Sequence, residues 1–236
     1  MKINLFISHD SNDEKIACLI AKELKEYGIN CFVAHPDIHP MKDWKNTIIE
    51  KLKSSDIVIA LINDDYFNKV WTNQEIGFAC KQETPILPIK LSDKNPEGMI
   101  SNLQALRSDA LKNDEYNEYT QYNAKEDSEK IVLNLPEIFP DININKLYIL
   151  KFIHAKNYND AIDYFKIMKK QDQKLDNDDV KLIIDGFHNN NQLHPNYLKK
   201  SNVLTDYLEE QTGNKYKIIN GKITQIVGRK TQFHPR

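Results

Sequence analysis

The sequence predicts an α/β protein in which a doubly wound sheet of five parallel strands is followed by a smaller, mostly helical domain. Short apolar segments alternate repeatedly with segments of helical periodicity. The strand-like segments are apolar at almost every position, as parallel strands covered on both faces require. Near the end of the chain, Asn220-Gly221 separates two β-rich runs and is typical of a tight hairpin turn. We therefore expect two domains, residues 1–140 and residues 141–236.

The first domain is predicted to alternate strand and helix from its first residues. Ser11-Asn12-Asp13-Glu14 has the pattern of a capping box that begins the first helix, and Gly28 stands where a left-handed residue would end it. A second helix carries Trp44 on an apolar stripe, and Thr72 is the expected cap of a third. The expected strands are residues 3–7, 29–34, 56–62, 86–91 and 106–111, and the later helices are residues 74–80, 96–106 and 126–139.

The second domain is predicted to contain three helices, residues 146–170, 176–189 and 198–212. A hairpin follows, with strands at residues 216–219 and 222–227. Three helices and a hairpin are compatible with a winged-helix-like module. Because such modules serve in DNA binding, protein interaction or dimerisation, the fold alone does not decide between these functions.

Composition narrows the class of protein. The net charge of −2 does not favour nucleic-acid binding, which usually requires a basic face. No apolar run approaches the ~20 residues of a membrane span, and nothing after Met1 resembles an export signal. The three cysteines form no CxxC pair, as is usual for reduced, buried thiols. We therefore expect a soluble, cytoplasmic protein without a membrane or nucleic-acid partner.

Four short motifs follow one another along the first domain. They are Leu5-Phe6-Ile7-Ser8-His9, then Cys31-Phe32-Val33-Ala34 with Asp37-Ile38-His39-Pro40 and Asp43-Trp44, then Trp71-Thr72-Asn73-Gln74-Glu75, and Ile86-Leu87-Pro88-Ile89. In sequence and order they resemble the motifs of bacterial Toll/interleukin-1 receptor (TIR) domains. The resemblance implies a flavodoxin-like fold over residues 1 to about 140. It also implies one of two functions, a self-assembling signalling module or an enzyme that cleaves NAD+ in anti-phage defence.

The resemblance assigns the catalytic carboxylate to Glu75 and places Trp71 beside the ligand. Cleavage of the nicotinamide-ribose bond builds a cationic ribosyl centre while nicotinamide leaves as a neutral molecule, so no general acid is needed and one carboxylate can suffice. The products would be nicotinamide and ADP-ribose or a cyclic ADP-ribose. Substrate contacts are expected from residues at the carboxyl ends of strands and in the motifs. They are Ser8, His9, Asp10, Phe32, Asp43 and Trp71.

Other interpretations of these residues remain open. A glutamate in the first turn of a helix is stabilised by the helix dipole without catalytic duty, and Trp71 can serve as a core anchor. Trp44 is expected in the core. The chain has no Rossmann or Walker phosphate loop and no metal-ligand spacing, so we expect neither a metal nor a cofactor, with NAD+ as substrate only. Expected partners are further copies of the TIR domain and an effector or phage-derived activator.

Overall fold

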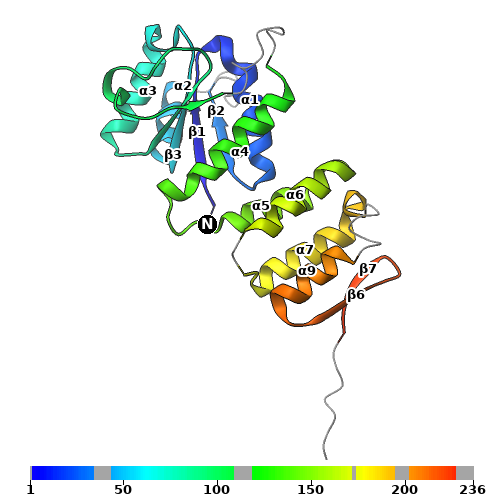
Figure 1. Cartoon of the computed structure of the whole chain (residues 1–236). Coiled ribbons are helices and arrows are strands. Elements are labelled where there is room, and N and C mark those ends of the chain that lie inside the picture. The colour runs from blue at the N-terminus through cyan, green and yellow to red at the C-terminus, as the bar shows by residue number, and fades with distance from the viewer. Residues whose placement is uncertain (1, 35–43, 109–118, 172–173, 195–201, 227–236) are drawn as a thin grey trace, which may run out of the picture. The chain divides into compact units, whose positions relative to one another are not determined.

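The computed structural model describes residues 2–34, 44–108, 119–171, 174–194 and 202–226. The chain divides into two compact units, Met1–Ile144 and Asn145–Arg236 (Figure 1). The sequence had suggested a boundary after residue 140. Among the described residues, no helix is both long and apolar enough to cross a membrane.

The first unit is built on a five-stranded parallel sheet, as predicted, and its strand order is β2-β1-β3-β4-β5. Figure 1 shows β1 flanked by β2 and β3. All six residues of β3 are buried, which explains its unbroken apolar sequence. Since β2 and β3 lie on opposite sides of β1, the chain reverses its winding direction at β1. The carboxyl ends of β1 and β3 therefore flank a topological switch point. The strands are β1 (Asn4–Ser8), β2 (Asn30–Val33), β3 (Ile57–Ile62), β4 (Ile86–Lys90) and β5 (Leu106–Arg107).

Helices cover both faces of this sheet (Figure 1). One face packs against α2 and α3, where Phe6 and Val58 of the sheet meet Ile48 and Ile76 of the helices. On the other face α1 and α4 lie side by side. The helical segments of this unit are η1 (Ser11–Asp13), α1 (Glu14–Glu26), α2 (Trp44–Lys53), η2 (Tyr66–Asn68), α3 (Val70–Lys81), η3 (Gly98–Ile100) and α4 (Gln121–Ile138).

Two helix predictions in this unit were wrong. The expected capping box is absent because the carboxylate of Asp10 caps η1, accepting from the backbone N–H of Asn12 and from the Ser11 hydroxyl. The helix expected over residues 96–106 is only the short turn η3, where Gly98 adopts a left-handed conformation (φ 59°). By contrast, Gly28 ends α1 with φ 77°, as predicted.

The second unit is helical and ends in the predicted hairpin. Asn220 and Gly221 both have positive φ, the backbone that a two-residue hairpin turn requires. Asp176 and Asp179 form a capping box at the start of α7. The described elements are α5 (Ile144–Ile153), α6 (Tyr158–Lys170), α7 (Asn177–Asn189), η5 (Asn191–Leu193), α9 (Val203–Thr212), β6 (Lys215–Ile219) and β7 (Lys222–Ile226).

The single helix predicted over residues 146–170 is in fact two helices. The side chain of Asn157 accepts from the backbone N–H of Asp160 and so caps α6. At the end of α5, the amide of Asn190 donates to the carbonyls of Ile153 and Ala155, at 3.0 and 2.9 Å. These side-chain bonds satisfy backbone groups that a continuous helix would pair internally, and hydrophobic periodicity does not reveal them.

Two helical glycines provide a matched test of this packing. A Cβ added to Gly186 of α7 would lie 2.4 Å from Cγ2 of Ile153, whereas one added to Gly77 of α3 would meet nothing within 4 Å. We expect Gly186→Ala to lower the free energy of unfolding by about 1–3 kcal/mol through overpacking. Gly77→Ala should raise it by up to about 1 kcal/mol through helix propensity. Urea unfolding followed by circular dichroism would measure both, and equal effects would contradict the packing described.

Candidate active site

The predicted catalytic residue, Glu75, lies in the second turn of α3 and is only 4% exposed. Its Oε2 accepts a hydrogen bond of 2.6 Å from the hydroxyl of Ser8, the last residue of β1. Ser8 is fully buried and pairs in register with Ala60 of β3. The carboxylate therefore reaches the carboxyl edge of the sheet at the β1/β3 switch point.

Strand alternation explains why Ser8 faces Glu75. Side chains two residues apart on a strand point to the same face, so Ser8 shares the face of Phe6, which packs beneath α2 and α3. A serine here interrupts an otherwise apolar face, and its partner in register on β3 is the small buried residue Ala60. Because these side chains are small, the carboxylate of Glu75 can reach the end of the sheet. Larger apolar side chains at the same position would fill this space.

The environment of Glu75 disfavours its charged form. Burial raises the pKa of Glu75 from 4.5 to about 7, and the hydrogen bond from Ser8 offsets only part of this effect. Because Glu75 lies one turn inside α3, and not in the first turn, its position differs from the one assumed in the helix-dipole explanation. A carboxyl group that titrates near neutrality in a polar recess of the core is typical of functional sites.

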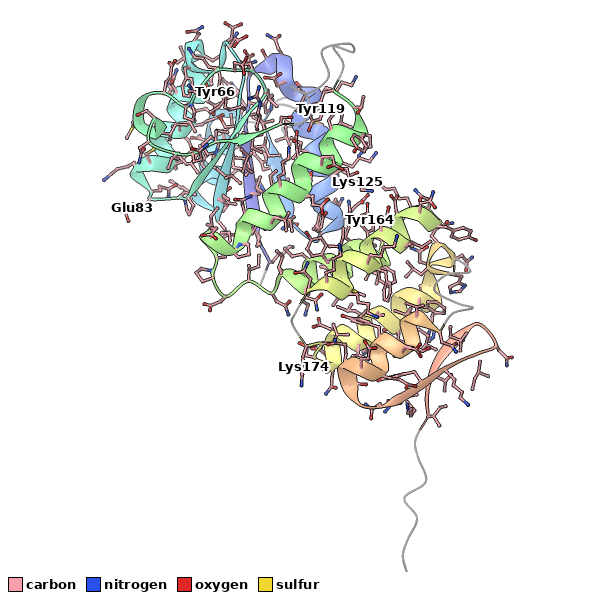
Figure 2. The ribbon with its side chains drawn as sticks, viewed as in Figure 1. Tyr66, Glu83, Tyr119, Lys125, Tyr164 and Lys174 are labelled. Carbon is pink, nitrogen blue, oxygen red and sulfur yellow. The ribbon has the colours of Figure 1, made fainter. Side chains whose placement is uncertain are left out.

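Tyr66, which is labelled in Figure 2, completes the hydrogen bonding around Ser8, and sequence reasoning missed it. Its hydroxyl lies 2.6 Å from Oγ of Ser8, and its side chain is fully buried. Its backbone carbonyl accepts from the hydroxyl of Thr72, so Thr72 ties η2 to α3 and is not the predicted helix cap. The available signal was an aromatic pair, Tyr66-Phe67, within an otherwise polar turn.

A second group of polar side chains lies at the same edge of the sheet. Asp10 is 1% exposed, and its Oδ2 is 3.3 Å from the ammonium of Lys69. Although burial acts to raise the pKa of Asp10, hydrogen bonds from Asn12, Ser11 and Lys69 outweigh it and hold the pKa below its usual value. The pair joins the end of β1 to the residue that precedes α3.

Asp13 and Asn63 connect this group to β3. The amide of Asn63 donates to Oδ2 of Asp13 at 2.6 Å. Burial, together with the nearby charge of Asp10, raises the pKa of Asp13 to about 6 despite that hydrogen bond. The carboxyl edge of β1 and β3 therefore carries two groups, Glu75 and Asp13, that change charge close to neutral pH.

The remaining predicted site residues are placed differently. His9 is 7% exposed and its Nδ1 lies 2.8 Å from the carbonyl of Asp10. Phe32 packs on Phe6 in the core, with ring centroids 5.4 Å apart. Asp43 lies outside the described residues.

Trp71 is half-buried and forms an edge-to-face pair with Trp44, at a centroid distance of 4.3 Å. The prediction that Trp44 lies in the core was wrong, since it is 43% exposed. Trp71 is one helical turn before Glu75, so both project from the same side of α3. The aromatic pair therefore forms a surface on the side of α3 that carries the carboxylate.

A cavity of about 680 Å³ lies elsewhere, along the edge strand β2, and Glu75 does not line it. Within the described ranges, no three His, Cys, Asp or Glu side chains are grouped so that they could hold a metal ion.

Comparison with known proteins agrees with this fold. The family model described as "TIR domain" matches residues 5–124, slightly more than half of the chain. The chain belongs to the TIR domain family. The match extends from β1 into α4 and includes Ser8, Tyr66 and Glu75.

Two solved TIR structures are similar to this chain. One is the TIR domain of the Toll-related receptor TRR-2 of Hydra magnipapillata, 20% identical, covering 44% of this chain and 82% of that one, with a TM-score of 0.38. The other comprises the TIR domains of the activated Roq1 resistosome, which recognises the pathogen effector XopQ. It is 14% identical and covers 71% of this chain and 98% of that one, with a TM-score of 0.36. No curated protein matches the chain.

The burial of Glu75 predicts a pH-dependent stability. Because its folded-state pKa of about 7 lies above its ordinary value of 4.5, the folded protein binds more protons than the unfolded chain between these pH values. Stability is therefore lost as the pH rises through this window, by about 3 kcal/mol in total. Glu75→Gln removes the ionisation, so it should be close to wild type at pH 4.5 and more stable by up to about 3 kcal/mol at pH 8.

Urea unfolding of both proteins across pH 4.5–8 measures this difference. Glu97→Gln is the matched control, because Glu97 is an exposed glutamate on the same domain that forms a surface ion pair with Lys94. The control should follow the wild type within about 0.5 kcal/mol. A Glu75→Gln difference that does not change with pH would contradict the burial described for this carboxyl group.

Proposed function

We propose that this TIR domain is an NAD+ nucleosidase in which Glu75 is the catalytic carboxylate. The observation that carries the proposal is the placement of Glu75, buried and bonded to Ser8, at the switch point between β1 and β3. Open α/β sheets bind their ligands at this point. TIR domains include enzymes that cleave NAD+ and modules that assemble in signalling. The burial of Glu75 lowers the stability of the fold when the carboxyl group ionises, and a destabilising carboxylate at a ligand-binding position favours the enzyme.

The chemistry required of Glu75 is electrostatic. As the bond between nicotinamide and ribose breaks, the ribosyl carbon becomes cationic, and an ionised carboxylate beside it stabilises the transition state. The positive nicotinamide ring becomes neutral on departure and needs no proton. Water or a nucleophile within the substrate then attacks the same carbon, giving ADP-ribose or a cyclic product.

The burial of Glu75 strengthens this effect. A carboxylate in a dry recess interacts with a developing cation much more strongly than one in water. The exposed ring of Trp44 and the half-buried ring of Trp71, packed edge to face, provide apolar ring surface on the same side of α3, against which a planar nicotinamide or adenine ring can stack. We further propose that the protein acts in the cytoplasm, in bacterial anti-phage defence.

Nicotinamide release from NAD+ by purified protein tests the proposal. Wild-type protein, assayed at concentrations high enough to force self-association, should release nicotinamide together with ADP-ribose or a cyclic relative, separated by chromatography. Glu75→Gln should lower the rate at least about 100-fold, while Glu97→Gln should retain it. Equal release by wild type and Glu75→Gln would refute the role of Glu75, and no release by either would refute the nucleosidase.

The rate should also rise with pH. Only the ionised form of Glu75 can stabilise the cationic centre, and its pKa is raised to about 7 by burial. The rate of NAD+ cleavage should therefore be half-maximal near pH 7 and fall roughly tenfold for each pH unit below about 6. Initial rates between pH 5 and 9 at saturating NAD+ would measure this, and a flat profile would show that the protonation of Glu75 does not control the reaction.

A second candidate function is assembly without catalysis. Val70 is 68% exposed and Trp44 is 43% exposed, and both lie next to Trp71 at the start of α2 and α3. Exposed apolar side chains that cluster in this way are typical of contact surfaces. If wild-type protein releases no nicotinamide but forms oligomers that Trp44→Ala disrupts, as measured by light scattering, the assembly function is favoured.

A further inference from the structure

The hydroxyl of Ser8 lies between two partners, 2.6 Å from Oε2 of Glu75 and 2.6 Å from the hydroxyl of Tyr66. All three side chains are buried. A serine hydroxyl has one hydrogen to donate and lone pairs to accept. It can therefore donate to one of these partners and must accept from the other.

The charge of Glu75 decides the direction of the chain of hydrogen bonds. An ionised carboxylate only accepts, so Ser8 must donate to Glu75 and Tyr66 must donate to Ser8. When Glu75 is protonated, the opposite direction becomes available, with Glu75 donating to Ser8 and Ser8 to Tyr66. If the hydroxyl of Tyr66 always donates to Ser8, Ser8 is left to donate to Glu75, and this direction favours the ionised form of Glu75.

We propose that Tyr66 is a positioning residue that acts through Ser8, holding Glu75 ionised with Oε2 occupied and Oε1 turned to the substrate. This inference rests on the proposed nucleosidase function for its catalytic meaning. Among the described residues, Oε1 of Glu75 has no hydrogen-bond partner, so it is the oxygen available to the ribose. Through the hydrogen bonds among the described residues, Tyr66 is joined to Glu75 by way of Ser8.

The setting of Tyr66 suits a permanent donor. Burial, together with the nearby charge of Glu75, raises the pKa of Tyr66 above its ordinary value of 10, so the phenol keeps its proton throughout the pH range in which Glu75 titrates. Its ring packs edge-to-face on Phe67 at 5.1 Å, and its carbonyl is bound by Thr72. Tyr66 is also the titratable side chain that faces Glu75 across Ser8.

A double-mutant cycle on the pKa of Glu75 tests the proposal. Tyr66→Phe keeps the ring and removes the donor, and Ser8→Ala removes the link. Both substitutions should raise the pKa of Glu75, read from the side-chain carboxyl carbon by NMR, and we expect about 0.5–1 pH unit for Tyr66→Phe. Because Tyr66 acts through Ser8, the double variant should have the same pKa as Ser8→Ala alone.

The rate of NAD+ cleavage should follow the same pattern. In Tyr66→Phe the pH profile should move upward by the same amount, giving about a 3- to 10-fold lower rate at pH 6 and little loss at pH 9, with KM nearly unchanged. A general loss of rate at every pH, without movement of the profile, would show a merely structural role and overturn the proposal. So would additive effects of the two substitutions on the pKa.

Two further measurements keep the outcome decisive. If Tyr66→Phe folds poorly, 3-fluorotyrosine at position 66 keeps ring and hydroxyl but donates more strongly, so it should lower the pKa of Glu75. An unchanged or higher pKa would overturn the proposal. The NMR measurement of the Glu75 pKa needs no substrate. If the wild type cleaves no NAD+, the nucleosidase function is refuted, but the effect of Tyr66 on the pKa of Glu75 can still be measured.

Discussion

The hydrogen bond between Ser8 and Glu75 depends on most of the first domain. β1 must end on a small hydroxyl residue, and β3 must offer Ala60 beside it in register. α3 must begin at Val70 so that Glu75 comes round to the sheet one turn later. The short η2 segment must place Tyr66 behind Ser8. The result is a carboxyl group whose ionisation makes the folded protein less stable. It lies at the position where an open sheet of this topology binds ligands.

Glu75 differs from the helix-capping polar groups of the second unit. There, Asn157, Asp176 and Asn190 cap helices or pair helix-end carbonyls, which are ordinary stabilising contacts. Glu75 is instead buried without a cationic partner among the described residues. Burial of a charge without a counter-charge is destabilising, and such groups are typical of functional sites.

Much of the fold could be predicted from the sequence, because strand burial, helix periodicity and glycine turns are local properties. Gly28 and the Asn220-Gly221 turn adopted the expected backbone. The break between α5 and α6 was missed, since it depends on Asn190, which is distant in the sequence. At the site, family motifs identified Glu75 and Ser8 as candidates, but not their contact. Tyr66 carries no motif-level signal, and only packing brings its hydroxyl to Ser8.

The order of the two units along the chain has a consequence for synthesis. All five strands of the sheet and α4 precede Asn145, so the first unit is complete before the second has been translated. Domains generally fold as they emerge from the ribosome, with the N-terminal one first. The hydrogen-bonded group of Ser8, Tyr66 and Glu75 can therefore form on a nascent chain, before the second unit has been made.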